Sequence, residues 1–248
     1  MSTLQQFAIK QPGNWWHAAL DLLLPPRCLL CGLPSGAICI CTACKQDLPR
    51  TGVHCPQCGL PLNTPVNEIC GRCIKRAARI THTVCPLQYC FPVDRLVQSL
   101  KFKRQLAAGR VLSHLLCEWV VRNNCDHPDA LVPVPLHSLR MFRRGFNQSF
   151  ELAAYTGKVL NVPLLTGALR RHRNTRAQSG LSRKQRRKNV RGAFYWHGPA
   201  QPGRHVALVD DVMTTGTTVN ECARILKKAG AKRVDVWVAA RAVPGGNQ

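Results

Sequence analysis

Apolar residues along the chain follow two spacings, one typical of helices and the other typical of buried strands. Helical spacing predicts helices over residues 94–100, 106–122, 148–160 and 217–229. Short apolar runs predict strands over residues 131–135, 204–209 and 233–240. Because strands and helices alternate, the pattern predicts an α/β fold with a parallel sheet, in which a ligand lies at the carboxyl ends of the strands.

One of these predicted strand ends carries the clearest chemistry in the chain. Residues 206–218 read VALVDDVMTTGTT, an apolar strand that ends at Asp210 and Asp211, then a loop of small residues, then a helix. Gly216 would let the backbone approach an anion, and hydroxyl and N–H groups at the helix start would donate hydrogen bonds to it. The two carboxylates could accept hydrogen bonds from paired ribose hydroxyls. The segment therefore predicts a site for a phosphorylated sugar.

Eight cysteines form four Cys-x-x-Cys pairs, which are Cys28/Cys31, Cys41/Cys44, Cys55/Cys58 and Cys70/Cys73. Two such pairs complete a tetrahedral zinc shell of four thiolates, which leaves no open position for catalysis. We expect two structural zinc sites with sequential pairing, one from the first two pairs and one from the last two. An interleaved arrangement is the alternative. Cys39 could replace Cys41, and His54 is a weaker substitute ligand.

The length and composition of the chain allow two units. Its 248 residues, 45% of them hydrophobic, suffice for one core of about 150 residues and a smaller module. No apolar run approaches the roughly 20 residues of a membrane span, and the N-terminal residues lack the pattern of a secretion signal. Metal binding in a reducing cytoplasm explains the 14 cysteines better than disulfides do. We therefore expect a cytoplasmic protein.

The charge of the chain predicts an anionic partner. The net charge is +23, of which residues 93–248 contribute +18. Residues 170–191 contain ten Lys or Arg and no acidic residue, so they could neutralise several backbone phosphates. Nearby aromatic residues, Phe142 and Tyr195 among them, could stack on bases, which favours single-stranded DNA. A solvated basic loop is the alternative. The candidate contacts are Arg173, Arg176, Arg183, Lys184, Arg186, Arg187 and Lys188.

These segments together resemble a known family. The cysteine pairs, VPVPL at 132–136, RRGFNQS at 143–149 and the segment at 206–218 resemble the ComF/GntX family of DNA-uptake and DNA-utilisation proteins. CPQCGLP and CGRC resemble its enterobacterial GntX branch most.

The resemblance implies a fold, a division into domains and partners. A type I phosphoribosyltransferase fold, a parallel sheet flanked by helices, would span residues 91–248. A small Cys-rich double zinc ribbon would span residues 25–90, after an amphipathic segment at 1–24. Partners would include DNA-uptake or recombination proteins.

The resemblance also implies roles for individual residues. Asp210 and Asp211 would bind the ribose hydroxyls of phosphoribosyl pyrophosphate (PRPP), with Mg2+ bridging pyrophosphate and ribose oxygens. Val134 and Pro135 would lie on the pyrophosphate loop. Arg143 and Arg144 just beyond it are the candidate catalytic residues, unless they form a solvated surface pair. The 5-phosphate would be bound by Thr214, Thr215, Gly216, Thr217 and Thr218.

Two functions are compatible with this predicted site. The first is a DNA-handling protein that binds single-stranded DNA and PRPP or another 5-phosphoribosyl ligand. The second is a metabolic phosphoribosyltransferase that displaces pyrophosphate from PRPP with an amine or a base. Because no catalytic base can be assigned, a binding module without turnover is a third reading. A glutamine-dependent amidotransferase is disfavoured, since the early cysteines are better explained as zinc ligands.

Overall fold

The computed structural model describes residues 26–66, 68–75, 79–173 and 190–243. The amphipathic segment predicted at 1–24 and residues 174–189 of the basic run lie outside the described residues. In the described ranges, no helix has the length and apolar character needed to cross a membrane.

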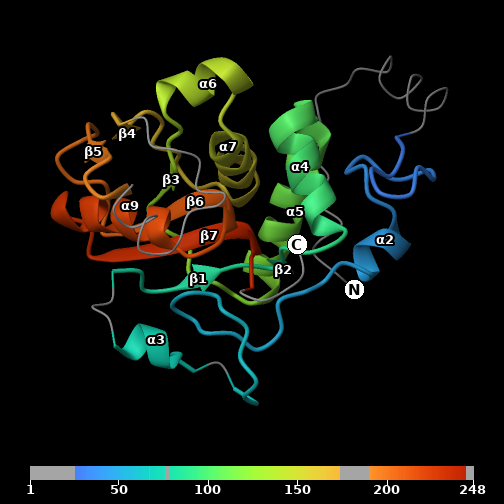
Figure 1. Cartoon of the computed structure of the whole chain (residues 1–248), viewed down its shortest axis with the longest axis horizontal. Coiled ribbons are helices and arrows are strands. Elements are labelled where there is room, and N and C mark those ends of the chain that lie inside the picture. Colours follow the sequence, from blue (N-terminus) through green and yellow to red (C-terminus); the bar gives the residue numbers. More distant parts are fainter. Residues whose placement is uncertain (1–25, 67, 76–78, 174–189, 244–248) are drawn as a thin grey trace.

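A five-stranded parallel sheet lies at the centre of the molecule (Figure 1). Its strands are β1 (Thr83–Val84), β2 (Leu87–Gln88), β3 (Ala130–Pro133), β6 (His205–Met213) and β7 (Arg233–Arg241). β7 pairs with β6 on one side and with both β1 and β2 on the other. β3 pairs with the far side of β6, so the two longest strands are central.

Helices cover both faces of this sheet. The helices α4 (Val93–Lys103), α5 (Leu106–Arg122) and α7 (Gln148–Leu160) pack on one face, and α9 (Thr217–Lys228) packs on the other. Alternate residues of β6 and β7 enter the two cores: Val209 and Trp237 face α5 and α7, whereas Leu208 and Val238 face α9. Burial on both faces is the reason that these strands are continuous apolar runs in the sequence.

Smaller elements border the sheet. The helix α6 (Ser138–Arg144) follows β3, and a hairpin of β4 (Leu169–Arg171) and β5 (Phe194–Trp196) lies beside α9 (Figure 1). The cysteine-rich part contains two short helices, α2 (Thr42–Gln46) and α3 (Gly71–Ile74). In Figure 1, α2 lies near α5, and α3 lies beyond the edge of the sheet that carries β1.

The predicted helices at 106–122 and 148–160 are confirmed at both ends. The predicted end of the strand at residue 209 is wrong, because β6 continues through Asp210 and Asp211 to Met213, where it still pairs with Arg241 of β7. Residues 83–88 contribute β1 and β2 to the sheet, although the predicted domain boundary at residue 90 assigned them to the zinc module. That boundary stays a prediction.

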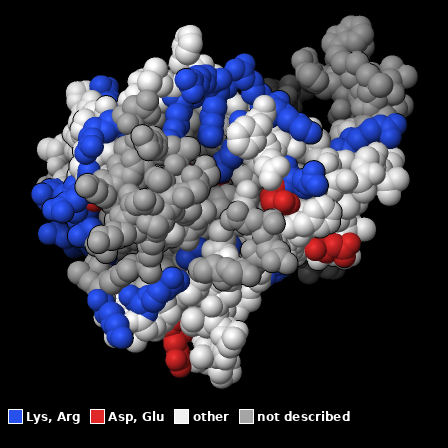
Figure 2. Space-filling model, in the orientation of Figure 1, with Lys and Arg blue, Asp and Glu red and all other residues white. Residues whose placement is uncertain are grey.

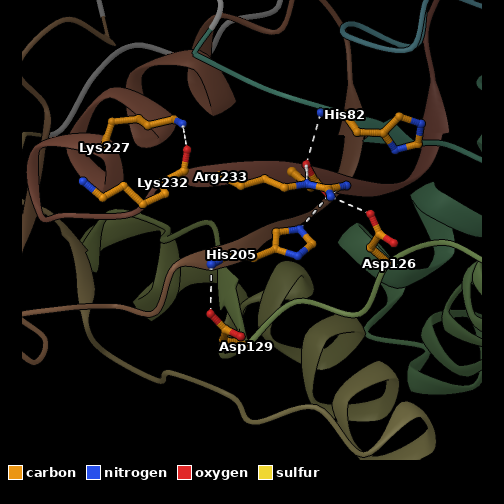
Figure 3. Close-up of polar contacts among 8 residues, drawn as sticks. His82, Asp126, Asp129, His205, Lys227, Lys232 and Arg233 are labelled. Atoms are coloured by element: carbon orange, nitrogen blue, oxygen red, sulfur yellow. Dashed lines mark hydrogen bonds and ion pairs between the residues drawn. The ribbon is translucent and has the colours of Figure 1, made fainter.

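Polar contacts tie together the amino ends of β6 and β7, the edge of the sheet opposite the acidic pair (Figure 3). Arg233 contacts Asp126 at 2.5 Å and Asp235 at 2.9 Å, and Nε2 of His205 lies 2.7 Å from Asp235. The backbone N–H of His205 donates to Asp129 at 2.9 Å. These contacts hold the amino ends of β6 and β7 together, on the far side of the sheet from Asp210 and Asp211.

Candidate functional site

Two clusters of four cysteines have the geometry of tetrahedral zinc sites. The Sγ atoms within each cluster lie no more than 4.8 Å apart, and the clusters are Cys28, Cys31, Cys41, Cys44 and Cys55, Cys58, Cys70, Cys73. Zn–S bonds of about 2.3 Å place two ligand sulfurs about 3.8 Å apart in a tetrahedral shell. The Cys31–Cys41 and Cys58–Cys70 sulfurs are each 3.7 Å apart. The residues therefore fit two structural zinc ions.

The clusters also decide between the predicted ligand sets. Sequential pairing is confirmed, because each cluster combines two neighbouring Cys-x-x-Cys pairs. Cys41, rather than Cys39, is the ligand of the first cluster, and its Sγ accepts a hydrogen bond from the Cys44 N–H at 3.5 Å. His54 belongs to neither cluster, and its Nδ1 lies 2.7 Å from the Gly52 carbonyl oxygen.

The first zinc module is joined to the helical face of the larger domain. Cys28, Ile40 and Leu48 are buried in the same core as α5. Lys45 of α2 forms an ion pair with Glu118 of α5. Burial alone would raise the pKa of Glu118, but hydrogen bonds from its basic neighbours His114 and Lys45 lower it to about 2. The carboxylate is thus held ionised against the module.

The second zinc module is joined to the predicted phosphate loop by one arginine. Arg241 ends β7 and is only 2% exposed. Its Nε donates to the carbonyl of the zinc ligand Cys58 at 2.8 Å, and its Nη1 donates to the carbonyl of Met213 at 2.9 Å and to that of Thr214. One buried guanidinium therefore connects a zinc turn to the end of β6 and the first residue of the loop.

A cavity of about 220 Å3 lies at the carboxyl ends of β3 and β6. Its wall contains most of the residues that the sequence assigned to the phosphoribosyl site: Val134, Pro135, Arg144, Asp210, Asp211, Thr214, Gly216, Thr217 and Thr218. The wall also contains Arg140 of α6. Four further polar side chains in the wall come from other elements: Lys101, Gln148, Ser149 and Arg171. The fold thus brings the acidic pair, the loop and several cations to one space.

The two acids of this cavity differ in their partners. Oδ2 of Asp211 lies 2.7 Å from Nζ of Lys101, and its Oδ1 accepts the Val212 N–H at 2.7 Å. Oδ1 of Asp210 accepts the Ser149 hydroxyl at 2.8 Å and the Asp211 N–H at 3.0 Å. None of the hydrogen bonds described for this pair uses Oδ2 of Asp210.

The charges of the acidic pair are coupled to each other and to Lys101. Burial and then the neighbouring charge of Asp211 raise the pKa of Asp210 to about 7. Burial alone would lower the pKa of Lys101, but attraction to Asp211 and Asp210 raises it, so this lysine is a fixed cation of the site. The cavity therefore holds one firmly paired carboxylate and one that ionises near neutral pH.

The loop after β6 has the backbone of an anion site. Gly216 has φ of +72°, a conformation that favours glycine, and it directly precedes α9 without a side-chain cap. The N–H groups of the first turn of α9 are consequently available to an anion. The hydroxyls of Thr215 and Thr217 lie 2.8 Å apart, and the Asn220 amide donates to the Gly216 carbonyl at 2.8 Å, which fixes the shape of the loop.

The wall across from the loop supplies a buried donor. Gln148 is 2% exposed, and its Oε1 accepts a hydrogen bond from Nη1 of Arg144 at 3.0 Å. Its Nε2 has no acceptor among the described residues. Because a buried amide without an acceptor is costly, this group independently indicates that the cavity takes a polar ligand.

Some predicted site residues lie elsewhere. Arg143 is exposed on α6 and is not part of the cavity wall, whereas Arg144, one helix position later, is part of it. Thr215 instead lines a smaller cavity of about 60 Å3 between the loop and the second zinc module. Of the predicted DNA contacts, Arg173 is described and exposed. The others lie outside the described residues: Arg176, Arg183, Lys184, Arg186, Arg187 and Lys188.

The zinc geometry predicts the metal content of the reduced protein. Elemental analysis should find two zinc ions per chain, and Cys31→Ser or Cys58→Ser should each lower the content to about one, since three thiolates bind zinc less tightly than four. Cys90→Ser is the matched control, because Cys90 is an exposed cysteine outside both clusters. Two ions retained in the Cys31→Ser and Cys58→Ser variants would contradict the two sites.

The contacts of Arg241 predict that the zinc turn supports the loop. Arg241→Met should weaken binding of ribose 5-phosphate about tenfold in calorimetry, because losing a charged hydrogen-bond donor frees the loop backbone. Both zinc ions should remain. The control is Arg233→Met at the opposite end of β7, which should leave the affinity unchanged. Equal affinities in the two variants would show that the loop does not depend on Arg241.

Comparisons with known proteins agree with the zinc modules and with the domain that carries the cavity. The model of the double zinc ribbon domain matches residues 19–74, and the model of the phosphoribosyl transferase domain matches residues 116–245. The chain is 38% identical to the DNA utilization protein YhgH of Escherichia coli (strain K12), over 89% of this chain and 99% of that protein. It is 36% identical to Competence protein F of Haemophilus influenzae, over 82% of this chain and 90% of that protein.

A solved structure, glutamine PRPP amidotransferase from B. subtilis, is similar over 58% of this chain and 30% of that chain, with 20% identity and a TM-score of 0.40. The identities to the two sequence relatives extend over most of each protein, and the two family models match the zinc module and the domain that carries the phosphoribosyl loop. The chain therefore belongs to the ComF/GntX family, in which a double zinc ribbon precedes a phosphoribosyltransferase domain.

Proposed function

We propose that this protein serves the use or uptake of DNA by binding single-stranded DNA together with PRPP or another 5-phosphoribosyl ligand. The observation that carries the ligand half of the proposal is the cavity at the carboxyl ends of β3 and β6. It combines an acidic pair, a glycine-containing loop before a helix, and a buried amide donor without an acceptor. This combination suits a ligand with hydroxyls at one end and phosphate at the other.

The ligand would lie with its 5-phosphate on the loop at Thr214–Thr218 and a ribose hydroxyl on Oδ2 of Asp210. A pyrophosphate on C1 would then lie beside Val134 and Pro135, within reach of Arg144 and the amide of Gln148. The carboxylates and ligand oxygens fit the preference of Mg2+ for oxygen, and the ion would supply charge to offset that of the pyrophosphate. The basic side chains of the wall would share this task.

Two observations support the DNA half of the proposal. Relatives of this chain bear the names DNA utilization protein and competence protein. In addition, Figure 2 shows Lys and Arg side chains gathered along the edge of the molecule that carries α6 and the nearby end of α4. A net charge of +23 favours a polyanion over a small ligand alone. The predicted contacts between Arg173 and Lys188 would add further positive charge for such a partner.

We also infer that the protein works in the cytoplasm. All 14 cysteines are free of disulfides, including exposed ones such as Cys31 and Cys90. A reducing compartment keeps such thiols available for zinc.

A metabolic phosphoribosyltransferase is the second candidate function. The observation that favours it is the position of Val134 and Pro135, which share one cavity with the phosphate loop. Consumption of PRPP with an amine or base, and without DNA, would identify this activity. Unchanged PRPP under the same conditions would leave binding as the function of the site.

The acidic pair gives the direct test of ligand binding. Asp210→Asn combined with Asp211→Asn should lower the affinity for PRPP or ribose 5-phosphate at least about tenfold, because the hydrogen bond of a ribose hydroxyl to a charged acceptor is lost. Calorimetry measures the affinity, and circular dichroism and zinc content check the fold.

The matched control for this pair is Asp126→Asn combined with Asp129→Asn, two acids near the amino ends of the strands. That variant should bind the ligand as the unmodified protein does. A wild-type affinity in the Asp210/Asp211 variant would refute the proposed site.

The raised pKa of Asp210 predicts how ligand affinity changes with pH. Asp210 is mostly protonated at pH 6 and mostly ionised at pH 8, and only the ionised form is a strong acceptor for a ribose hydroxyl. Affinity for ribose 5-phosphate should therefore rise about tenfold between these values.

Ionisation of the ligand phosphate near pH 6 contributes to the same rise. Asp210→Asn separates the two effects, because it removes the contribution of the carboxyl and keeps that of the phosphate. If the variant shows the full rise, Asp210 is not the titrating group.

A further inference from the structure

We infer that the cavity takes the 5′-phosphorylated end of a single DNA strand, and that the strand leaves across an aromatic rim formed by Phe102 and Arg104 of the α4 end with Phe142 and Arg143 of α6. This inference rests on the proposed function, since it joins the phosphoribosyl ligand and the DNA into one molecule. The 5′-terminal nucleotide of a DNA strand is itself a phosphorylated pentose.

The size of the cavity limits how much of a strand it can hold. About 220 Å3 is below the roughly 300–1,000 Å3 of pockets that enclose drug-sized ligands, so the cavity can hold only the terminal part of a strand. The rest of a strand would have to lie outside. A terminal 5-phosphate is the part of DNA that matches the loop before α9, because an internal phosphate is a diester with fewer free oxygens.

The charges of the wall suit a ligand with more than one phosphate. The wall contains Lys101, Arg140, Arg144 and Arg171 against two acids. Lys101 already compensates Asp211, and Ser149 already donates to Asp210. Both carboxylates therefore keep a donor from the protein even when the ligand is a deoxyribose, which has no 2′-hydroxyl.

The acidic pair also sets the direction in which the strand leaves. If the deoxyribose of the 5′-terminal nucleotide turns its C3′ side toward Asp210 and Asp211, the esterified 3′ oxygen that continues the strand lies on that side. Lys101 lies there too, 2.7 Å from Asp211, and is positioned for the next phosphate. The Phe102 ring lies beside Arg144, which also lines the cavity, so the rim adjoins the mouth of the cavity.

The rim has the composition of a stacking surface for single-stranded nucleic acid. Phe102 is 73% exposed and Phe142 is 87% exposed, and exposed aromatic rings next to cations are typical of such surfaces. Nη2 of Arg104 donates to the Arg143 carbonyl at 3.4 Å, which joins the end of α4 to α6.

Arg144 connects the rim to the cavity. Its guanidinium carbon lies 5.8 Å from the centre of the Phe102 ring, and its Nη1 donates to Gln148 in the cavity wall. A small phosphoribosyl metabolite would use the cavity without the rim. The exposed Phe102 ring beside Arg144, together with the basic edge in Figure 2, favours a longer polyanion that carries bases.

The first experiment compares short single-stranded oligonucleotides of one sequence by fluorescence anisotropy. The 5′-phosphorylated form should bind about tenfold more tightly than the 3′-phosphorylated form, which has the same charge, since only the former places a monoester on the loop. Ribose 5-phosphate should compete and reduce binding to the level of the 3′-phosphorylated form.

The second experiment tests the rim. Phe102→Leu combined with Phe142→Leu should weaken binding of the 5′-phosphorylated oligonucleotide about tenfold through lost stacking. Affinity for ribose 5-phosphate should stay unchanged, which also shows that the fold and the cavity are intact. Phe91→Leu is the matched control, because Phe91 is 72% exposed near the opposite end of α4.

The outcomes separate this inference from the proposed function. If the oligonucleotides and ribose 5-phosphate all bind, two results would overturn the binding of the 5′ end in the cavity. One is equal affinity for the 5′- and 3′-phosphorylated strands, and the other is a lack of competition by ribose 5-phosphate. An unchanged oligonucleotide affinity in the Phe102/Phe142 variant would overturn the rim. If ribose 5-phosphate or every oligonucleotide fails to bind the unmodified protein, the proposed function fails as well.

Discussion

The buried guanidinium of Arg241 is the contact on which the arrangement of the site depends most. It lies at the end of a central strand and satisfies carbonyls from a zinc turn, from the end of β6 and from the first residue of the loop. A charge this deeply buried is tolerated only where its N–H groups are hydrogen-bonded, so the positions of the acceptor carbonyls are tightly constrained. The second zinc module is therefore part of the support of the loop that follows β6.

The acidic pair is stabilised by partners that come from distant parts of the chain. Lys101 on α4 and Ser149 at the start of α7 meet the carboxylates of β6 across the face of the sheet. Two adjacent acids without such partners would raise the pKa of each other and repel an anionic ligand. The helices thus compensate the two carboxylates that line the same cavity as the loop before α9.

Much of this description could be predicted from the sequence, because the information is local. The apolar spacing gives the ends of α5 and α7, and the Cys-x-x-Cys spacing gives both zinc shells with sequential pairing. The end of β6 could not be predicted, since Asp210 and Asp211 are typical of turns and only pairing with β7 keeps them in a strand. β1 and β2 have two residues each, too few to show a period.

The missed site residues have a common cause, which is that tertiary contacts decide their roles. Lys101 lies in a basic stretch, KFKR, that shows no sign of a partner among the acids more than a hundred residues later. The sequence gives no reason to prefer Arg143 or Arg144 as the site residue. Because neighbouring helix positions differ in direction by about 100°, only Arg144 lines the cavity. Arg241 follows a valine-rich strand and carries no motif of its own.

The position of β7 in the sheet has a consequence for the order in which the molecule can be completed during synthesis. This strand is the last of the five along the chain, yet it lies between β6 and the pair β1 and β2. The eight cysteines leave the ribosome long before it, so metal can be bound while the sheet still lacks its central strand. The cavity at the carboxyl ends of β3 and β6 can acquire its final shape only afterwards, so the zinc modules can form early and the cavity only late.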